Sequence, residues 1–367
     1  MRSRRLWGFV SHQCRSHETK LSGLSSEKDK RLIDVHTHVL PRRYMAFLAK
    51  QGISRPQRLP PPSDAPPGNR MTPWSDSAED VDMRINLMDH AGVRQHILSP
   101  TFAPYLEDKA AAATAARLVN REIAALVVKK PDRFRSFASL PLPHIDEALA
   151  EIDYAFDVFG MDGATIQCFV GNRSATDPLF EPVYAELNRR GAVLFLHPCV
   201  NGLCSKFVND PSLELSLGPP LEDTVIAVHY MISTIPNRYR NLKIIIPHLA
   251  GGLAMLLRRL DNQLPLVASL AEPPSITARR MWYDSCCHGS SAAMNAAIEA
   301  FGADRIVLGS DYPFLTPHET YGETIGFLAR LGLSDSALEL VLRGNAEALL
   351  RQERRPSAEP ACFRAAP

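Results

Sequence analysis

The feature that most constrains the fold is a regular alternation of short apolar runs with longer stretches of helical periodicity. The runs that we expect to form strands cover residues 32–36, 93–99, 134–140, 163–168, 192–197, 242–247, 281–285 and 305–309. Together with the helical stretches between them they make eight βα units of roughly 30 to 40 residues, which match a (β/α)8 TIM barrel. A doubly wound open sheet is the alternative, and it predicts a glycine-rich phosphate-binding turn after the first strand. This chain has His36-Thr-His-Val-Leu-Pro41 at that position, which favours the barrel.

Three segments fall outside this alternation. Residues 1–30 carry several arginines and serines before the first acidic residues, and we expect a disordered extension, with an organellar transit peptide as the alternative. Residues 41–77 are predicted to form an irregular, proline-rich insertion after the first strand, and residues 352–367 a disordered tail. The sequence therefore predicts one barrel domain over residues 31–351.

Composition excludes several classes of function. The chain of 367 residues has a formal net charge of +1, so no overall field favours nucleic acid or a membrane surface as a partner. No apolar run reaches the roughly 18 residues that a membrane-spanning helix needs. The seven cysteines form no Cys-x-x-Cys motif, which indicates free thiols in a reducing compartment, and we expect a cytoplasmic protein.

Polar residues close or directly follow four of the predicted strands. They are His36 and His38 at the first strand, His197 at the fifth, His248 at the sixth and Asp311 at the eighth. Each one alone has an ordinary interpretation as a hydrogen-bonded residue at a strand end. In a (β/α)8 barrel, however, the carboxyl ends of all strands meet at one rim, which is where the active site lies. The joint pattern therefore predicts a functional site.

The residue types at this rim indicate a metal site. Neutral imidazole suits zinc and similar transition metals, and a catalytic zinc takes about three protein ligands and leaves a position open. We expect His36, His38 and His197 to supply nitrogen ligands and Asp311 a carboxylate. His248 is then expected to act as a general acid or base near neutral pH, with a role as a fifth ligand as the alternative.

Longer motifs carry a family resemblance. They are Asp34-Val-His-Thr-His-Val-Leu-Pro41, Phe195-Leu-His-Pro198, His248-Leu-Ala-Gly-Gly252, Leu308-Gly-Ser-Asp-Tyr-Pro313 and Arg343-Gly-Asn-Ala346. With these motifs the chain resembles the amidohydrolase superfamily. Within it, the chain resembles the metal-dependent non-oxidative decarboxylases, a branch that includes aminocarboxymuconate-semialdehyde, 6-methylsalicylate and γ-resorcylate decarboxylases. The resemblance implies one divalent ion, Zn²⁺ or alternatively Mn²⁺, no organic cofactor, and a homodimer. Binuclear members carry a carboxylated lysine after the fourth strand, and its absence here implies a mononuclear site.

The resemblance also suggests residues that bind the substrate. Arg259, eleven residues after His248, corresponds to an arginine that reaches a substrate carboxylate across a dimer interface; a solvated helix face is the alternative. Arg70 and Trp74 lie in the segment 41–77, where they are candidates to cover the pocket, with ordinary loop contacts as the alternative. His288 follows the seventh strand and is a candidate to line the pocket.

The expected function is that of a carboxy-lyase. Its substrate would be a small aromatic or dienoic carboxylate, such as a hydroxybenzoate or carboxymuconate semialdehyde. A hydrolase of a lactone, amide or ester is the alternative, because the same metal-activated water could attack a carbonyl carbon. A catalytically silent binding protein is a third interpretation, and it predicts a missing ligand residue that this sequence does not show.

Overall fold

A computed structural model describes residues 32–53, 74–199, 202–205, 208, 213–316 and 319–350. Eight strands form one sheet in the order β1-β2-β3-β4-β7-β8-β9-β10. Their bounds are β1 Leu32–His38, β2 Val93–Ser99, β3 Phe134–Ser139, β4 Gly163–Gln167, β7 Val193–His197, β8 Lys243–Ile246, β9 Trp282–Asp284 and β10 Ile306–Val307. Every neighbouring pair is parallel. Main-chain contacts between β1 and the segment after β10 close the sheet, which confirms the predicted (β/α)8 barrel.

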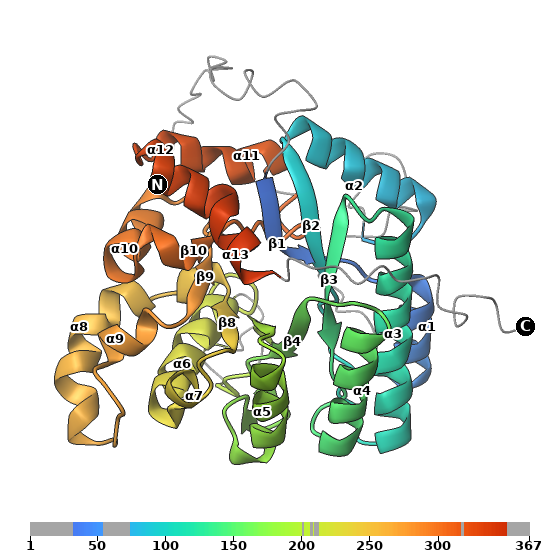
Figure 1. Ribbon diagram of the computed structural model, residues 1–367, viewed down its shortest axis with the longest axis horizontal. Coiled ribbons are helices and arrows are strands. Elements are labelled where there is room, and N and C mark those ends of the chain that lie inside the picture. The colour runs from blue at the N-terminus through green and yellow to red at the C-terminus, as the bar shows by residue number, and fades with distance from the viewer. Residues whose placement is uncertain are drawn as a thin grey trace, which may run out of the picture.

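Helices surround the strands, and the blue β1 lies beside the orange β10 (Figure 1). The helices in the first half are α1 Arg42–Lys50, α2 Ala78–His90, α3 Lys109–Lys129, α4 Ile145–Asp157 and α5 Glu181–Arg189. Those in the second half are α6 Gly218–Ser233, α7 Ile235–Arg238, α8 Leu253–Gln263, α9 Pro274–Ala278, α10 Ser291–Phe301, α11 Tyr321–Gly326, α12 Asp335–Glu339 and α13 Asn345–Leu349. A short hairpin, β5 Phe169–Val170 with β6 Arg173–Ser174, follows β4. No helix in the described part of the chain is both long and apolar enough to cross a bilayer.

The core has an inner and an outer part, as side-chain alternation along the strands requires. In β7, Val193 and Phe195 belong to the smaller cluster inside the barrel, whereas Leu194 and Leu196 pack in the larger cluster beneath the helices. Leu349, from α13, joins the inner cluster. The strand whose odd-numbered residues fill the barrel therefore also aims its last residue, the odd-numbered His197, inward.

The segment 41–77 differs from its prediction where it is described. Residues 42–50 form α1, whose Tyr44 and Leu48 are four residues apart and fully buried, so the prediction of an irregular segment is wrong there. Residues 54–73 lie outside the described part of the chain, as do the predicted extension 1–30 and tail 352–367. At the C-terminal end, α12 and α13 are joined by the π-helical turn Leu340–Gly344, so residues 335–349 are helical throughout.

Candidate active site

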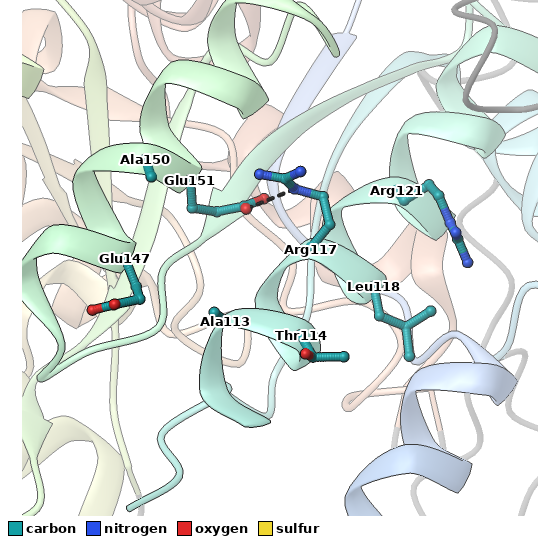
Figure 2. Close-up of a pocket in the computed structure, with 8 residues that line it drawn as sticks. All are labelled: Ala113, Thr114, Arg117, Leu118, Arg121, Glu147, Ala150 and Glu151. Atoms are coloured by element: carbon teal, nitrogen blue, oxygen red, sulfur yellow. Dashed lines mark hydrogen bonds and ion pairs between the residues drawn. The ribbon is translucent and has the colours of Figure 1, made fainter. Parts of the chain in front are cut away.

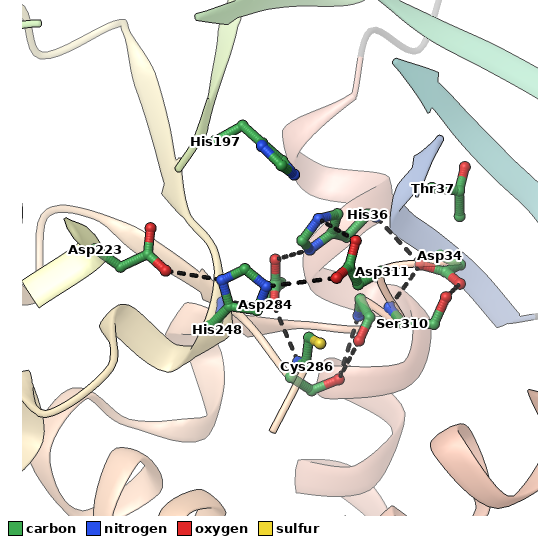
Figure 3. A network of polar contacts seen from close by, with 12 residues as sticks. Asp34, His36, Thr37, His197, Asp223, His248, Asp284, Cys286, Ser310 and Asp311 are labelled. Carbon is green, nitrogen blue, oxygen red and sulfur yellow. Dashed lines mark hydrogen bonds and ion pairs between the residues drawn. The ribbon is translucent and has the colours of Figure 1, made fainter. Parts of the chain in front are cut away.

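Three imidazoles and one carboxylate converge at the carboxyl end of the barrel. The ligand atoms of His36, His38, His197 and Asp311 all lie within 4.8 Å of one another. Figure 3 labels three of these residues, His36, His197 and Asp311. Asp311 Oδ1 is 3.0 Å from His38 Nε2 and 3.3 Å from His36 Nε2. Despite this proximity, the buried atoms His36 Nε2 and Asp311 Oδ1 make no hydrogen bond. A cation between these atoms would satisfy them, so the donor set fits a divalent metal ion.

Local backbone irregularities aim these side chains. Strict alternation from the inward-facing Val35 would turn His36 and His38 away from the barrel interior. The pairing of β1 with β2 shifts register between Asp34 and Thr37, and a shift of this kind re-aims the residues beside it. Asp311, on the opposite side of the group, has a left-handed φ of 56°, which is rare for a residue with a side chain and is found preferentially at functional sites.

Charge and burial leave most of the donors in the state that a metal ion requires. Burial, together with the neighbouring imidazoles, lowers the pKa of His197 well below its ordinary value, and burial also lowers that of His38. Burial opposes ionisation of Asp311, but the charge of His36 and the contacts with His36, His38 and His248 together outweigh it and hold the pKa of this carboxyl well below its usual range. Two neutral imidazoles and an ionised carboxylate are suitable ligands as they stand.

The carboxylate of Asp284 contacts the ring nitrogen of His36 that does not face Asp311. Its Oδ2 is 2.8 Å from His36 Nδ1, and its Oδ1 accepts hydrogen bonds from the main chain of His248 and Cys286, each at 3.0 Å. Burial opposes protonation of His36, but Asp284 and Asp311 outweigh it and raise the pKa of His36 to about 9. Such contacts fix the orientation of a ligating imidazole. The sequence prediction missed Asp284, although it ends β9 in the way that His197 ends β7.

We call His36, His38, His197 and Asp311 the metal group. His248 lies beside this group and is held by a second carboxylate. Its Nδ1 is 2.7 Å from Asp223 Oδ2, and its Nε2 is 3.7 Å from Asp311 Oδ2. Burial opposes protonation, but Asp223 raises the pKa of His248 well above its ordinary value. Asp223 comes from α6 and is fully buried. The sequence prediction missed it as well, because no strand end or motif marks an acid on this helix.

A buried polar chain connects outer helices to the metal group. The Tyr321 hydroxyl of α11 donates to Asp34 and is 2.7 Å from His96 Nε2. Arg84 of α2, which is 2% exposed, contacts the other nitrogen of His96 and donates to the main-chain oxygen of His38. Burial raises the pKa of Asp34 to about 6. These contacts position the backbone that carries two of the imidazoles.

The residues predicted to bind substrate do not all lie near the metal group. Trp74 is 3% exposed, and its ring centroid is 4.5 Å from that of Phe314, which is 5.5 Å from that of His38. His288 lies exposed in the turn between β9 and α10, and Arg259 lies exposed on α8. Arg70 lies outside the described residues. Within the described part of one chain, the structure thus brings only Trp74 close to the metal group.

A groove of about 490 Å³ lies elsewhere, between α3 and α4 (Figure 2). Arg117 and Glu151, which both line it, form an ion pair of 2.8 Å, and Glu151 also accepts a hydrogen bond from Asn120. The groove belongs to the outer helical layer and shares no lining residue with the metal group, so it adds nothing to the site at the rim.

Comparisons with known proteins show the family to which the chain belongs. The model of the family described as amidohydrolase matches residues 33–352. The 6-methylsalicylic acid decarboxylase of Penicillium expansum is 28% identical over 86% of this chain and 94% of its own length. The 2-amino-3-carboxymuconate-6-semialdehyde decarboxylase of Dictyostelium discoideum is 25% identical over 86% of this chain and 90% of its own.

A solved structure shows the same fold. It is that of a dihydroxybenzoic acid decarboxylase from Polaromonas sp. JS666 with bound manganese and the inhibitor 2-nitroresorcinol. It superposes with a TM-score of 0.70 at 23% identity, and the match covers 87% of this chain and 96% of that chain. The resemblance predicted from the motifs is confirmed, and the chain belongs to the amidohydrolase family.

Proposed function

We propose that this protein is a metal-dependent carboxy-lyase that releases CO₂ from a small aromatic or dienoic carboxylate. The observation that carries the proposal is the placement of the Asp223–His248 pair directly beside the group of three imidazoles and Asp311. The relatives named above are decarboxylases of compounds of this kind, which supports the same chemistry here. Within this class we propose a hydroxybenzoate or a carboxymuconate semialdehyde as substrate.

His36, His38, His197 and Asp311 would hold one divalent ion. When bound, the ion would polarise the substrate carboxylate and the oxygen next to it. Three nitrogens and one carboxylate favour Zn²⁺, and Mn²⁺, the ion in the Polaromonas structure, is the second candidate.

His248 would deliver a proton to the carbon that bears the carboxylate. Asp223 holds Nδ1 at 2.7 Å, so the imidazole presents Nε2 toward Asp311 and the metal group. Protonation of that carbon interrupts the conjugation of the substrate. The bond to the carboxylate then breaks, its electron pair restores the conjugation, and CO₂ leaves. Because the substrate itself accepts the electron pair, the reaction needs no organic cofactor.

Aromatic side chains would hold a planar substrate over the metal group. Phe314 lies between Trp74 and His38, with edge-to-face contacts to both rings. Rings in this arrangement form an apolar wall that excludes water, and flat substrates pack well against such walls. Exclusion of water favours loss of CO₂ over attack of water on a carbonyl carbon.

We also propose a homodimer and a cytoplasmic location. On α8, which carries Arg259, the side chain of Met255 is 81% exposed, and after this helix Leu266 and Val267 are 79% and 83% exposed. Large apolar side chains exposed in this way favour contact with a second copy, whose site Arg259 would then reach. The cysteines that the structure describes are free thiols, which supports a reducing compartment.

The experiment compares the wild type with Asp311→Ala on a panel of hydroxybenzoates, dienoic carboxylates, lactones and esters. We expect CO₂ release by the wild type, and we expect Asp311→Ala to lose its metal ion. Its turnover should fall by more than the roughly 10- to 100-fold typical of mutations behind a metal ligand. Asp304→Ala removes a 61% exposed acid shortly before β10 and is the matched control. It should retain both the metal ion and the turnover of the wild type. Ring opening or ester cleavage without CO₂ release would show that the hydrolase alternative is right.

A further inference from the structure

The sequence places two adjacent cysteines, Cys286 and Cys287, one residue beyond the end of β9, and the proposed reaction uses neither thiol. Cys286 is 2% exposed and lies next to His248 and Asp311 (Figure 3). The sulfur of Cys286, a ring nitrogen of His248 and a carboxylate oxygen of Asp311 all lie within 4.8 Å of one another. The neighbouring Cys287 is directed elsewhere, because its sulfur contacts the main-chain oxygen of Ser290.

The two carboxylate oxygens of Asp311 face different histidines. Its Oδ1 faces His36 and His38, at 3.3 and 3.0 Å, whereas its Oδ2 is 3.7 Å from His248 Nε2. Asp223 occupies the other nitrogen of His248, so only Nε2 is available on this side. A carboxylate placed in this way can bind two cations at once, one through each oxygen.

We propose that His248, Cys286 and Asp311 form a second cation site, which is selective for thiophilic divalent ions such as Zn²⁺ and Cd²⁺. Sulfur selects soft and borderline metals, whereas Mn²⁺ prefers oxygen ligands, so the second site discriminates between ions more strongly than the first. As the sulfur–metal bond forms, the thiol proton leaves to solvent. The His248 and Asp311 side chains are 14% and 16% exposed, so the three residues are not fully closed off from solvent.

Occupation of the second site has a consequence for catalysis that rests on the proposed function. The ion binds Nε2 of His248, which is the nitrogen that would deliver the proton, so an excess of Zn²⁺ inhibits the enzyme. An equal excess of Mn²⁺ does not, because it binds only the first group. The metal dependence of activity is therefore expected to rise and then fall with Zn²⁺ but to rise to a plateau with Mn²⁺.

The test titrates purified full-length protein with Cd²⁺ and follows the ultraviolet charge-transfer absorption of a thiolate bound to cadmium. The first group contains no sulfur, so Cd²⁺ bound there is silent in this absorption. We expect the wild type and the matched control Cys287→Ser to bind a second equivalent with this signal. Cys286→Ser should keep the first equivalent, which also shows that it is folded, and lose the signal.

The proposal is overturned if Cys286→Ser retains the thiolate signal, or if the wild type binds a single equivalent at saturation. A parallel assay measures CO₂ release with excess Zn²⁺ or Mn²⁺. Inhibition by Zn²⁺ that is present in the wild type and in Cys287→Ser supports the complete proposal. A thiolate signal without inhibition by Zn²⁺ supports the second site and shows that the proposed role of His248 is wrong. Failure of the second site and failure of the proposed function therefore give different results.

Discussion

At the scale of single residues, the contact between Asp223 and His248 distinguishes a positioned acid from an ordinary buried histidine. The Asp223 carboxylate is fully buried and 2.7 Å from Nδ1, which fixes the tautomer and the direction of Nε2. Asp223→Asn keeps the shape but removes the charge and can present an amide donor to Nδ1. Because acid–base catalysis typically contributes about 10²- to 10⁴-fold, we expect kcat to fall by about 10²-fold or more.

Metal content and KM separate this role from a structural one. Asp223 is not among the four residues of the metal group, so Asp223→Asn should bind the ion as the wild type does and keep a similar KM. Asp153→Asn, in an acid of α4 that is 65% exposed, serves as the control. A loss of bound metal in proportion to the loss of kcat would instead make Asp223 a structural support of the metal group.

At the scale of elements, the sequence predicts the strands well. It predicts poorly the backbone irregularities that set the direction of side chains. The runs of β7 and β8 are visible because buried parallel strands are rich in apolar residues, whereas β1 and β2 also carry polar residues. The register shift in β1 is not visible, because it depends on pairing with β2 rather than on the local residues. The same limit applies to the left-handed turn at His248, Leu249 and Ala250, where glycine would be the usual residue. Tertiary hydrogen bonds hold this turn, including one from Thr224 to the main-chain oxygen of Ala250.

The short helix α9 illustrates an element that depends on charges at its ends. Glu272 precedes it and Arg280 follows it, and they form a two-point ion pair with distances of 2.5 and 2.6 Å. The hydrogen bond from Arg280 outweighs partial burial and lowers the pKa of Glu272 to about 2. A helix of five residues has little stability of its own, so this pair is expected to stabilise it.

Glu272→Gln should therefore lower the free energy of unfolding by about 1 kcal/mol or less near neutral pH. The folded pKa lies below the ordinary value of 4.5, so the contribution is present above about pH 4.5 and is lost as the pH falls toward 2. Urea denaturation at about pH 7 and about pH 4 measures the difference between the variants, which should shrink at the lower pH. Glu299→Gln in α10 is the control, and a difference that stays constant with pH would contradict the ion-pair explanation.

At the scale of the whole molecule, the metal group lies at the seam where the barrel closes. The sequence predicts that the rim residues meet, because all strand ends of a barrel share one face. It does not show how weak the closure is, since β10 has only two residues. The closing contacts are hydrogen bonds from Val35 to Leu308 at 2.9 Å and from His38 to Tyr312 at 2.7 Å. His36 and His38 lie on one side of this seam and Asp311 lies on the other, so an ion bound by them joins the first strand to the last.

Removal of the ion should therefore destabilise the fold as a whole and the seam most of all. At a free ion concentration about 1,000 times Kd, binding adds about 4 kcal/mol to the free energy of unfolding. Without the ion, the proton that His36 retains, with its pKa of about 9, replaces part of the missing positive charge, so the apo protein is expected to stay folded. The melting temperature should rise when Zn²⁺ is added to chelator-treated wild type, but not when it is added to Asp311→Ala. Hydrogen exchange should show the largest gain in protection at the amides of Val35 and His38, and equal protection with and without the ion would contradict this coupling.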